Sequence, residues 1–102
     1  MLAAPRDQVA RALLEEANRL ARFETDASTR MGQEGAARLG SGSRLLTHCN
    51  TGCLATVGEG TALAVVRHAF REGRARSVTC TETRPWMQGA RLSAFELARE
   101  GW

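Results

Sequence analysis

The spacing of apolar residues divides the chain into a helical first part and a second part of mixed strand and helix character. From residue 5 to about residue 39, apolar positions recur at steps of three and four, with arginine and glutamate between them, which is typical of a helix. Residues 25–29 contain Thr, Asp and Ser, which compete for backbone hydrogen bonds, so we expect a break or bend there. The sequence GSGS at 40–43 ends the helical part. The apolar stripe consists of Val9, Leu13, Ala17, Leu20, Ala27 and Met31.

Beyond residue 43 the pattern alternates between short strands and helices. RLLTHC at 44–49 and SVTCTE at 77–82 are typical of strands, whereas EGTALAVVRHAFREG at 59–73 has the apolar period of a helix. A second helix follows within WMQGARLSAFELAREG at 86–101. The residues expected to pack inward from these helices are Ala62, Val65, Val66, Ala69, Leu92, Phe95 and Leu97.

The order strand, helix, strand, helix predicts two parallel strands joined by a right-handed crossover. We therefore predict an α/β fold, with a helical segment at 1–40 followed by half of a Rossmann-like parallel sheet at 41–102. A parallel sheet is normally buried on both faces, which two strands and two helices cannot achieve alone. The chain is accordingly expected to associate with itself or to form part of a larger sheet.

The amino-acid composition excludes several classes of partner and of reaction. The 102 residues suit one domain, and no apolar run reaches the roughly 20 residues that span a bilayer. The start of the chain carries early acidic residues and no apolar core, so we expect a cytoplasmic protein with no membrane partner. All 14 cations are arginine, which excludes a Schiff-base or P-loop lysine. These arginines are spread over every segment with few aromatic residues, which argues against a nucleic-acid partner.

Two residues stand where a parallel sheet presents its ligand site, at the carboxyl ends of the strands. Cys49 ends the first strand, and Gln88 comes shortly after the second. A free cysteine is among the most buried residue types, so the residues alone leave Cys49 open between a packing residue and a nucleophile. The neighbouring His48 points to the opposite face of a strand and is expected to be a structural, hydrogen-bonded histidine.

The remaining cysteines and glycines give weaker signals. Three cysteines without CxxC spacing predict neither a disulfide framework nor a metal site, so Cys53 and Cys80 are interpreted as small buried groups. The glycines at 52, 58 and 60 precede a helix whose free amides could bind an anion such as phosphate.

Two longer segments carry a family resemblance. LLTHCNTGCLATVGEGTALAVVRHA and ETRPWMQGARLSAFEL, in this order and spacing, closely resemble methylthioribose-1-phosphate isomerase, the aldose-ketose isomerase of methionine salvage. The weaker ETDASTRMGQEGAARL resembles the helices that precede them, so the match covers most of residues 24–101. The related superfamily includes ribose-1,5-bisphosphate isomerase and the regulatory subunits of a translation-initiation exchange factor.

The resemblance implies a catalytic role for Cys49 and a substrate-binding role for Gln88, with methylthioribose-1-phosphate as substrate. It implies no metal and no organic cofactor, and a homodimer for the full-length family member. The family's catalytic Asp and its arginine-containing substrate loops fall in segments that this sequence does not match, so we expect an inactive fragment or a shortened relative. Cys53 and Thr81 depart from the family pattern. The alternative is a non-catalytic sugar-phosphate-binding or assembly module like the regulatory subunits.

Overall fold

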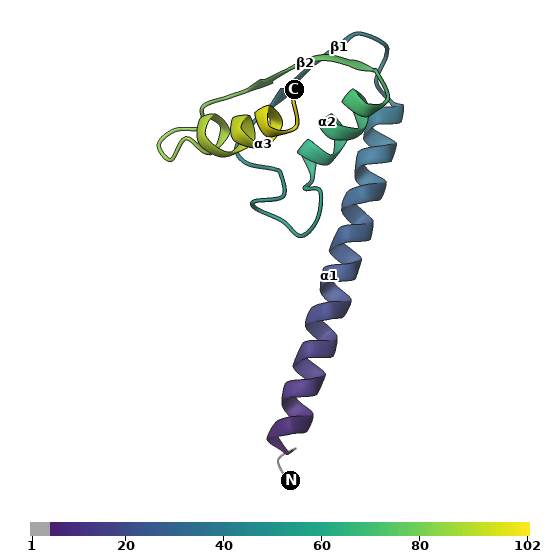
Figure 1. The fold of residues 1–102 in the computed structure, drawn as a ribbon, viewed down its shortest axis with the longest axis vertical. Coiled ribbons are helices and arrows are strands. Elements are labelled where there is room, and N and C mark those ends of the chain that lie inside the picture. The colour runs from purple at the N-terminus through teal and green to yellow at the C-terminus, as the bar shows by residue number, and fades with distance from the viewer. Residues whose placement is uncertain (1–4) are drawn as a thin grey trace.

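A long helix and a small α/β unit make up the computed structural model, which describes residues 5–102 (Figure 1). The predicted α/β class and the order of elements are confirmed, and the longest dimension is 61 Å because the helix projects far beyond the unit. The boundary expected after residue 40 stays a prediction. The elements are α1 (Arg6–Ala37), β1 (Ser43–Thr47), α2 (Ala62–Arg71), β2 (Ala75–Cys80), the π-helical turn η1 (Gly89–Ser93) and α3 (Ala94–Arg99).

Helix α1 runs without interruption, so the break expected at residues 25–29 is wrong. The Thr25 hydroxyl donates to the carbonyl of Ala21, four residues earlier, at 2.8 Å. A threonine that bonds to the preceding turn in this way satisfies its hydroxyl inside the helix instead of competing with it. At about 1.5 Å per residue, 32 residues make a rod of roughly 48 Å.

Small residues, and not the apolar stripe, form the face of α1 that packs on α2. Ser28, Gly32 and Ala36 are its buried residues. A Cβ at Gly32 would overlap the His68 ring, so glycine is needed for the two helices to approach each other. The stripe predicted the helix correctly but lies largely in solvent, with Leu13, for example, 66% exposed.

The sheet consists of β1 and β2 in parallel, with Leu45 opposite Val78 and Thr47 opposite Cys80. Helix α2 connects the strands, and the core beneath the sheet is built from Leu63, Val66 and Leu97. Several partly buried apolar residues pack against this core, namely Leu45, Phe70, Val78, Cys80 and Trp102. Both outer edges and one face of this two-stranded sheet carry no further element in the described residues, so only the core side is covered.

Two of the residues expected to pack inward are instead exposed. Ala62 lies at the exposed start of α2, where Leu63 and Ala64 are buried instead, and Phe95 on α3 is 53% exposed. Leu97 was predicted correctly and is 3% exposed. Because α3 contributes a single turn and a half, only one of its apolar residues can reach the core.

The uncovered surfaces predict self-association of the isolated chain. Leu46 is 73% exposed on the open sheet face, and exposed apolar patches of this kind promote association. Size-exclusion chromatography with light scattering should show a concentration-dependent oligomer, and Leu46→Glu or Leu13→Glu should shift it toward the monomer. A monodisperse monomer at every concentration would contradict this expectation.

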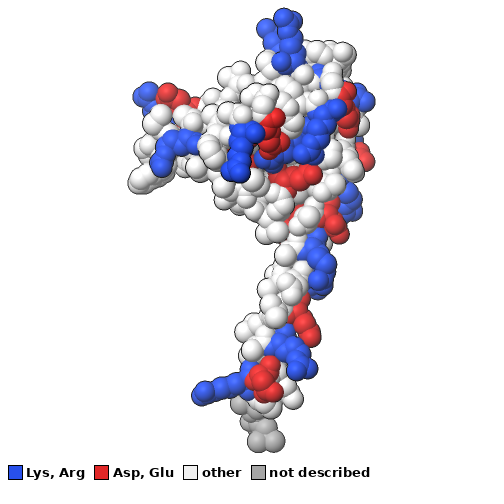
Figure 2. Space-filling view, in the orientation of Figure 1, with Lys and Arg blue, Asp and Glu red and all other residues white. Residues whose placement is uncertain are grey.

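Charge is distributed over the face of the molecule that Figure 2 presents. In Figure 2, arginine and acidic side chains alternate along α1 and over the α/β unit, so that face shows no continuous basic patch. Within residues 5–102 no helix is both long enough and apolar enough to span a membrane.

Candidate functional site

The two segments singled out by sequence meet at the carboxyl edge of the sheet. Thr47 and Cys80 are the last paired residues, and the Thr81 amide still donates to the Thr47 carbonyl at 3.0 Å. Cys49 follows two residues after β1. Gln88 immediately precedes Gly89, which packs so closely on the Thr81 carbonyl that a Cβ there would overlap it. The structure therefore places both candidate residues at the edge where topology predicts a ligand site.

The backbone of Cys49 is in an unusual, tightly held conformation. Its φ is 65°, and Thr83 and Met87 across the site have φ values of 60° and 59°. Such left-handed conformations cost a non-glycine residue about 1–3 kcal/mol and occur mainly where the surroundings enforce them, often at functional sites. The Cys49 amide donates to Thr83 Oγ1 at 2.8 Å, and its carbonyl accepts from Ser93 Oγ at 2.7 Å.

His48 does not form a pair with the Cys49 thiol. Its Nδ1 lies 2.7 Å from Thr81 Oγ1, which lies 3.2 Å from Thr83 Oγ1. A row of hydroxyls thus links His48 to the Cys49 amide, as expected for a structural histidine. Thr81 is the middle member of this row, in contact with both His48 and Thr83.

A buried carboxylate organises the loop that follows Cys49. Glu96 on α3 is 4% exposed and accepts from Asn50 Nδ2 at 3.0 Å and from the backbone amides of Cys53 and Leu54 at 2.9 and 3.3 Å. Arg67 on α2, also 4% exposed, donates to the same carboxylate at 2.9 Å. The loop, α2 and α3 are therefore joined through one side chain.

These contacts change the acidity of the groups involved. Burial alone would raise the pKa of Glu96, but hydrogen bonds from Asn50, Cys53 and Arg67 outweigh it and lower that pKa to about 2. Burial alone would lower the pKa of Arg67, but hydrogen bonds with Glu100 and Glu96 outweigh this effect and raise the pKa above its usual value. Both members of the pair therefore stay charged throughout the neutral range.

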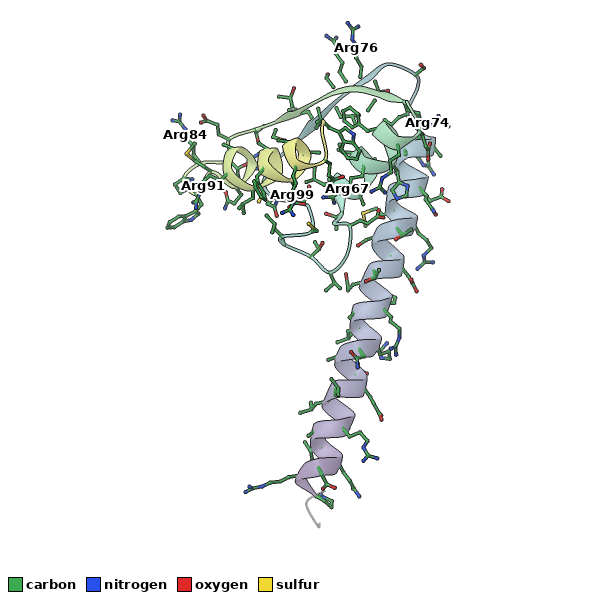
Figure 3. All side chains as sticks on the ribbon, viewed as in Figure 1. Arg67, Arg74, Arg76, Arg84, Arg91 and Arg99 are labelled. Atoms are coloured by element: carbon green, nitrogen blue, oxygen red, sulfur yellow. The ribbon has the colours of Figure 1, made fainter. Side chains whose placement is uncertain are left out.

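No role was predicted from the sequence for Asn50, Arg67 or Glu96. A usable signal was present, since Arg67 follows the buried Leu63 by four residues and so lies on the same side of α2. Figure 3 shows Arg67 reaching toward α3, whereas Arg84 in the loop before η1 and Arg91 in η1 project from the outer end of the α/β unit. An arginine on a buried helix face needs a carboxylate partner.

The other two cysteines differ from the expectation. Cys53 is exposed, so its interpretation as a buried group is wrong, and Cys80 is half-buried. The Cys53 thiol donates to Glu96 at 3.1 Å, and this bond raises its pKa. Burial raises the pKa of the Cys80 thiol.

Four backbone amides in the glycine-rich loop and at the start of α2, where a phosphate was expected, are hydrogen-bonded within the chain. The amides of Thr61 and Leu63, at the start of α2, both donate to the Thr51 carbonyl, at 2.8 and 3.4 Å. The amides of Cys53 and Leu54 donate to Glu96. These four donors are therefore already satisfied within the chain.

Gln88 has unused hydrogen-bonding capacity. Its side-chain carbonyl oxygen is buried and has no hydrogen-bond partner among residues 5–102, which costs about 1–3 kcal/mol unless a ligand or another group donates to it. Two grooves, of about 720 and 340 Å³, lie elsewhere: the larger runs along β2 beside Phe70 and Trp102, and the smaller beside Phe95 and Arg99. The sheet edge at Cys49 and Gln88 is thus marked by the left-handed backbone of Cys49 and by the unpaired oxygen of Gln88.

Comparison with known families and proteins agrees with the resemblance noted in the sequence. The model of the Initiation factor 2 subunit family matches residues 3–102. A methylthioribose-1-phosphate isomerase from Nitrosococcus oceani is 51% identical over 90 residues, which are 88% of this chain and 26% of the relative. One from Syntrophotalea carbinolica is 45% identical over 101 residues, which are 99% of this chain and 29% of the relative. The chain spans about a quarter of the length of the curated relatives it matches.

Two solved structures share the fold. The 5-methylthioribose 1-phosphate isomerase from Pyrococcus horikoshii OT3 superposes with a TM-score of 0.86 at 43% identity, over 97% of this chain and 28% of that one. The translation initiation factor eIF-2B subunit delta from A. fulgidus gives a TM-score of 0.77 at 47% identity, over 86% of this chain and 26% of that one. Isomerases and an initiation-factor subunit are therefore both similar to this chain.

Proposed function

Because the chain belongs to the Initiation factor 2 subunit family, we propose that it forms the cysteine-bearing part of a methylthioribose-1-phosphate isomerase. The observation that carries the proposal is the position of Cys49, held in a left-handed conformation at the carboxyl edge of the sheet. Gln88 lies at the same edge with an unpaired carbonyl oxygen. The isomerases among the relatives give the reaction its substrate.

The proposed reaction converts methylthioribose-1-phosphate to methylthioribulose-1-phosphate. The hydrogen on C2 moves to C1, the bond between C1 and the ring oxygen breaks, the C2 hydroxyl loses its proton and the ring oxygen gains one. In this scheme the Cys49 thiol faces the reacting carbons, where a positioned acid or base contributes typically about 10²- to 10⁴-fold. Gln88 accepts a hydrogen bond from a sugar hydroxyl through its side-chain carbonyl.

The proposal requires further groups from outside this chain. The resemblance puts an Asp and the arginine-containing substrate loops in segments that the sequence does not match. The purified 102-residue chain should therefore give no detectable ketose when incubated with methylthioribose-1-phosphate and followed by proton NMR. Robust turnover by the chain alone would contradict the need for those groups.

A graft tests the function itself. The matched segment of the Syntrophotalea carbinolica isomerase is replaced by this chain, which aligns with it over 101 residues, to give the grafted isomerase. The proposal predicts ketose formation by the grafted isomerase, and Gln88→Ala in the graft should raise KM. A folded grafted isomerase without activity, in this host and in the Nitrosococcus oceani relative, would contradict the proposal.

The likeness to an initiation-factor subunit supports a second candidate, a non-catalytic sugar-phosphate-binding or assembly module. Such a module would bind the sugar phosphate, or assemble with its partners, without converting the substrate. The graft separates the two candidates, since a non-catalytic segment would leave the grafted isomerase folded and inactive.

A further inference from the structure

Two hydroxyl groups hold both backbone polar atoms of Cys49. Thr83 Oγ1 accepts from the Cys49 amide, and Ser93 Oγ donates to the Cys49 carbonyl. Both residues come from the segment after β2, at separations of 34 and 44 residues along the chain. Ser93 is fully buried, so its hydroxyl is fixed by its surroundings.

These two hydrogen bonds hold the Cys49 backbone in an unfavourable conformation. Cys49 has a φ of 65°, a conformation that its side chain disfavours and that a loop residue leaves unless other contacts retain it. Glu96 holds the following loop by hydrogen bonds to Asn50 and to the amides of Cys53 and Leu54. Within the described residues, Glu96 makes no hydrogen bond with Cys49 itself. The direct restraints on the Cys49 peptide come from Thr83 and Ser93.

From this geometry we infer that Thr83 and Ser93 are positioning residues, which fix the direction of the Cys49 thiol by clamping its peptide. The inference rests on the proposed function, in which that thiol acts on the sugar carbons. Thr83 is itself restrained, because its φ is 60° and its hydroxyl contacts the hydroxyl of Thr81. Thr81 in turn contacts His48, so the row of hydroxyls that ends at His48 holds Thr83 in place. Because the two hydrogen bonds fix the Cys49 backbone and so its Cα–Cβ bond, the thiol starts from a defined position when the substrate arrives.

The positioning role of Thr83 and Ser93 is tested first in the 102-residue chain, by the reactivity of the Cys49 thiol and not by catalysis. The rate of iodoacetamide modification of Cys49 is measured by peptide mass spectrometry, with the half-buried Cys80 as an internal reference for the fold. Thr83→Val and Ser93→Ala should each change the rate at Cys49 by about fivefold or more, the factor expected for one hydrogen bond of ordinary net strength. Thr83→Ser keeps the hydroxyl and should stay within about twofold, as should Cys80 in every variant.

The grafted isomerase provides the second readout. Thr83→Val and Ser93→Ala should lower kcat by about fivefold or more at unchanged KM, because the thiol is misdirected while sugar binding is retained. Thr83→Ser should restore kcat. A grafted isomerase that is folded but inactive in both hosts contradicts the proposed function, whereas the modification rates in the 102-residue chain report on the positioning role in either case.

Three outcomes overturn the inference. The first is an unchanged rate at Cys49 in both Thr83→Val and Ser93→Ala. The second is Thr83→Ser behaving like Thr83→Val, because the hydroxyl would then be irrelevant. The third is a parallel acceleration at Cys80, since the two hydroxyls would then support the fold as a whole and not the Cys49 peptide.

Discussion

Cys49→Ala in the grafted isomerase is expected to lower kcat by about 10²- to 10⁴-fold, the range for loss of one positioned acid-base group. The thiol is the only reactive atom that the substitution removes, and the backbone contacts with Thr83 and Ser93 do not involve it. The folded structure should therefore survive. Steady-state kinetics with methylthioribose-1-phosphate gives the loss, and circular dichroism checks the fold.

Cys53→Ala is the matched control for this substitution. Cys53 is exposed, and its thiol donates to Glu96, so its removal should affect stability slightly and leave kcat within about twofold. Unimpaired turnover by the Cys49→Ala graft would remove Cys49 from the proposed mechanism.

Glu96→Gln should have the largest effect on stability, lowering the free energy of unfolding by about 3–5 kcal/mol. The substitution leaves Arg67, which is 4% exposed, with one carboxylate partner fewer, and the new amide group brings a donor toward the donors of Cys53 and Arg67. Urea denaturation followed by circular dichroism measures the loss. Glu16→Gln is the control, because the Glu16–Arg19 pair lies in solvent and its loss should leave the free energy of unfolding nearly unchanged. Equal unfolding energies for Glu96→Gln and the unsubstituted chain would show that the buried pair is neutral.

The same carboxylate predicts a pH dependence. The folded pKa of Glu96 is lowered from 4.5 to about 2, so its contribution is complete above pH 4.5 and is lost as the pH falls through about 2. The difference corresponds to about 3 kcal/mol. Unfolding measured between pH 6 and pH 2 should show this loss in the unsubstituted chain and little of it in Glu96→Gln. A curve of the same shape for both proteins would assign the acid sensitivity to other groups.

The order of elements and the position of the site were predictable from sequence because they depend on local patterns. The change from helical period to strand, helix, strand, helix gives the parallel pair β1 and β2, and topology alone then puts Cys49 and Gln88 at one edge. The helical stripe predicted α1, but the face that packs on α2 is formed by Ser28, Gly32 and Ala36, whose small side chains give no hydrophobic signal.

The interactions that hold the site were not predictable, because they join residues far apart in sequence. Glu96 contacts Asn50 across 46 residues and Arg67 across 29, and no local period encodes either contact. The phosphate-binding interpretation of the glycine loop was unsupported for the same reason, since the amides of Cys53 and Leu54 are satisfied by that distant carboxylate. The interruption of α1 was expected from composition, but Thr25 satisfies its hydroxyl within the helix.

Protection of Cys49 by substrate tests most directly whether this edge of the sheet is the sugar-phosphate site. The grafted isomerase is treated with iodoacetamide with and without methylthioribose-1-phosphate, and modification of each cysteine is followed by mass spectrometry alongside residual activity. We predict that activity falls in step with modification of Cys49, and that substrate slows modification at Cys49 but not at the exposed Cys53. Full activity after complete modification of Cys49, or protection that is equal at both cysteines, would contradict the account.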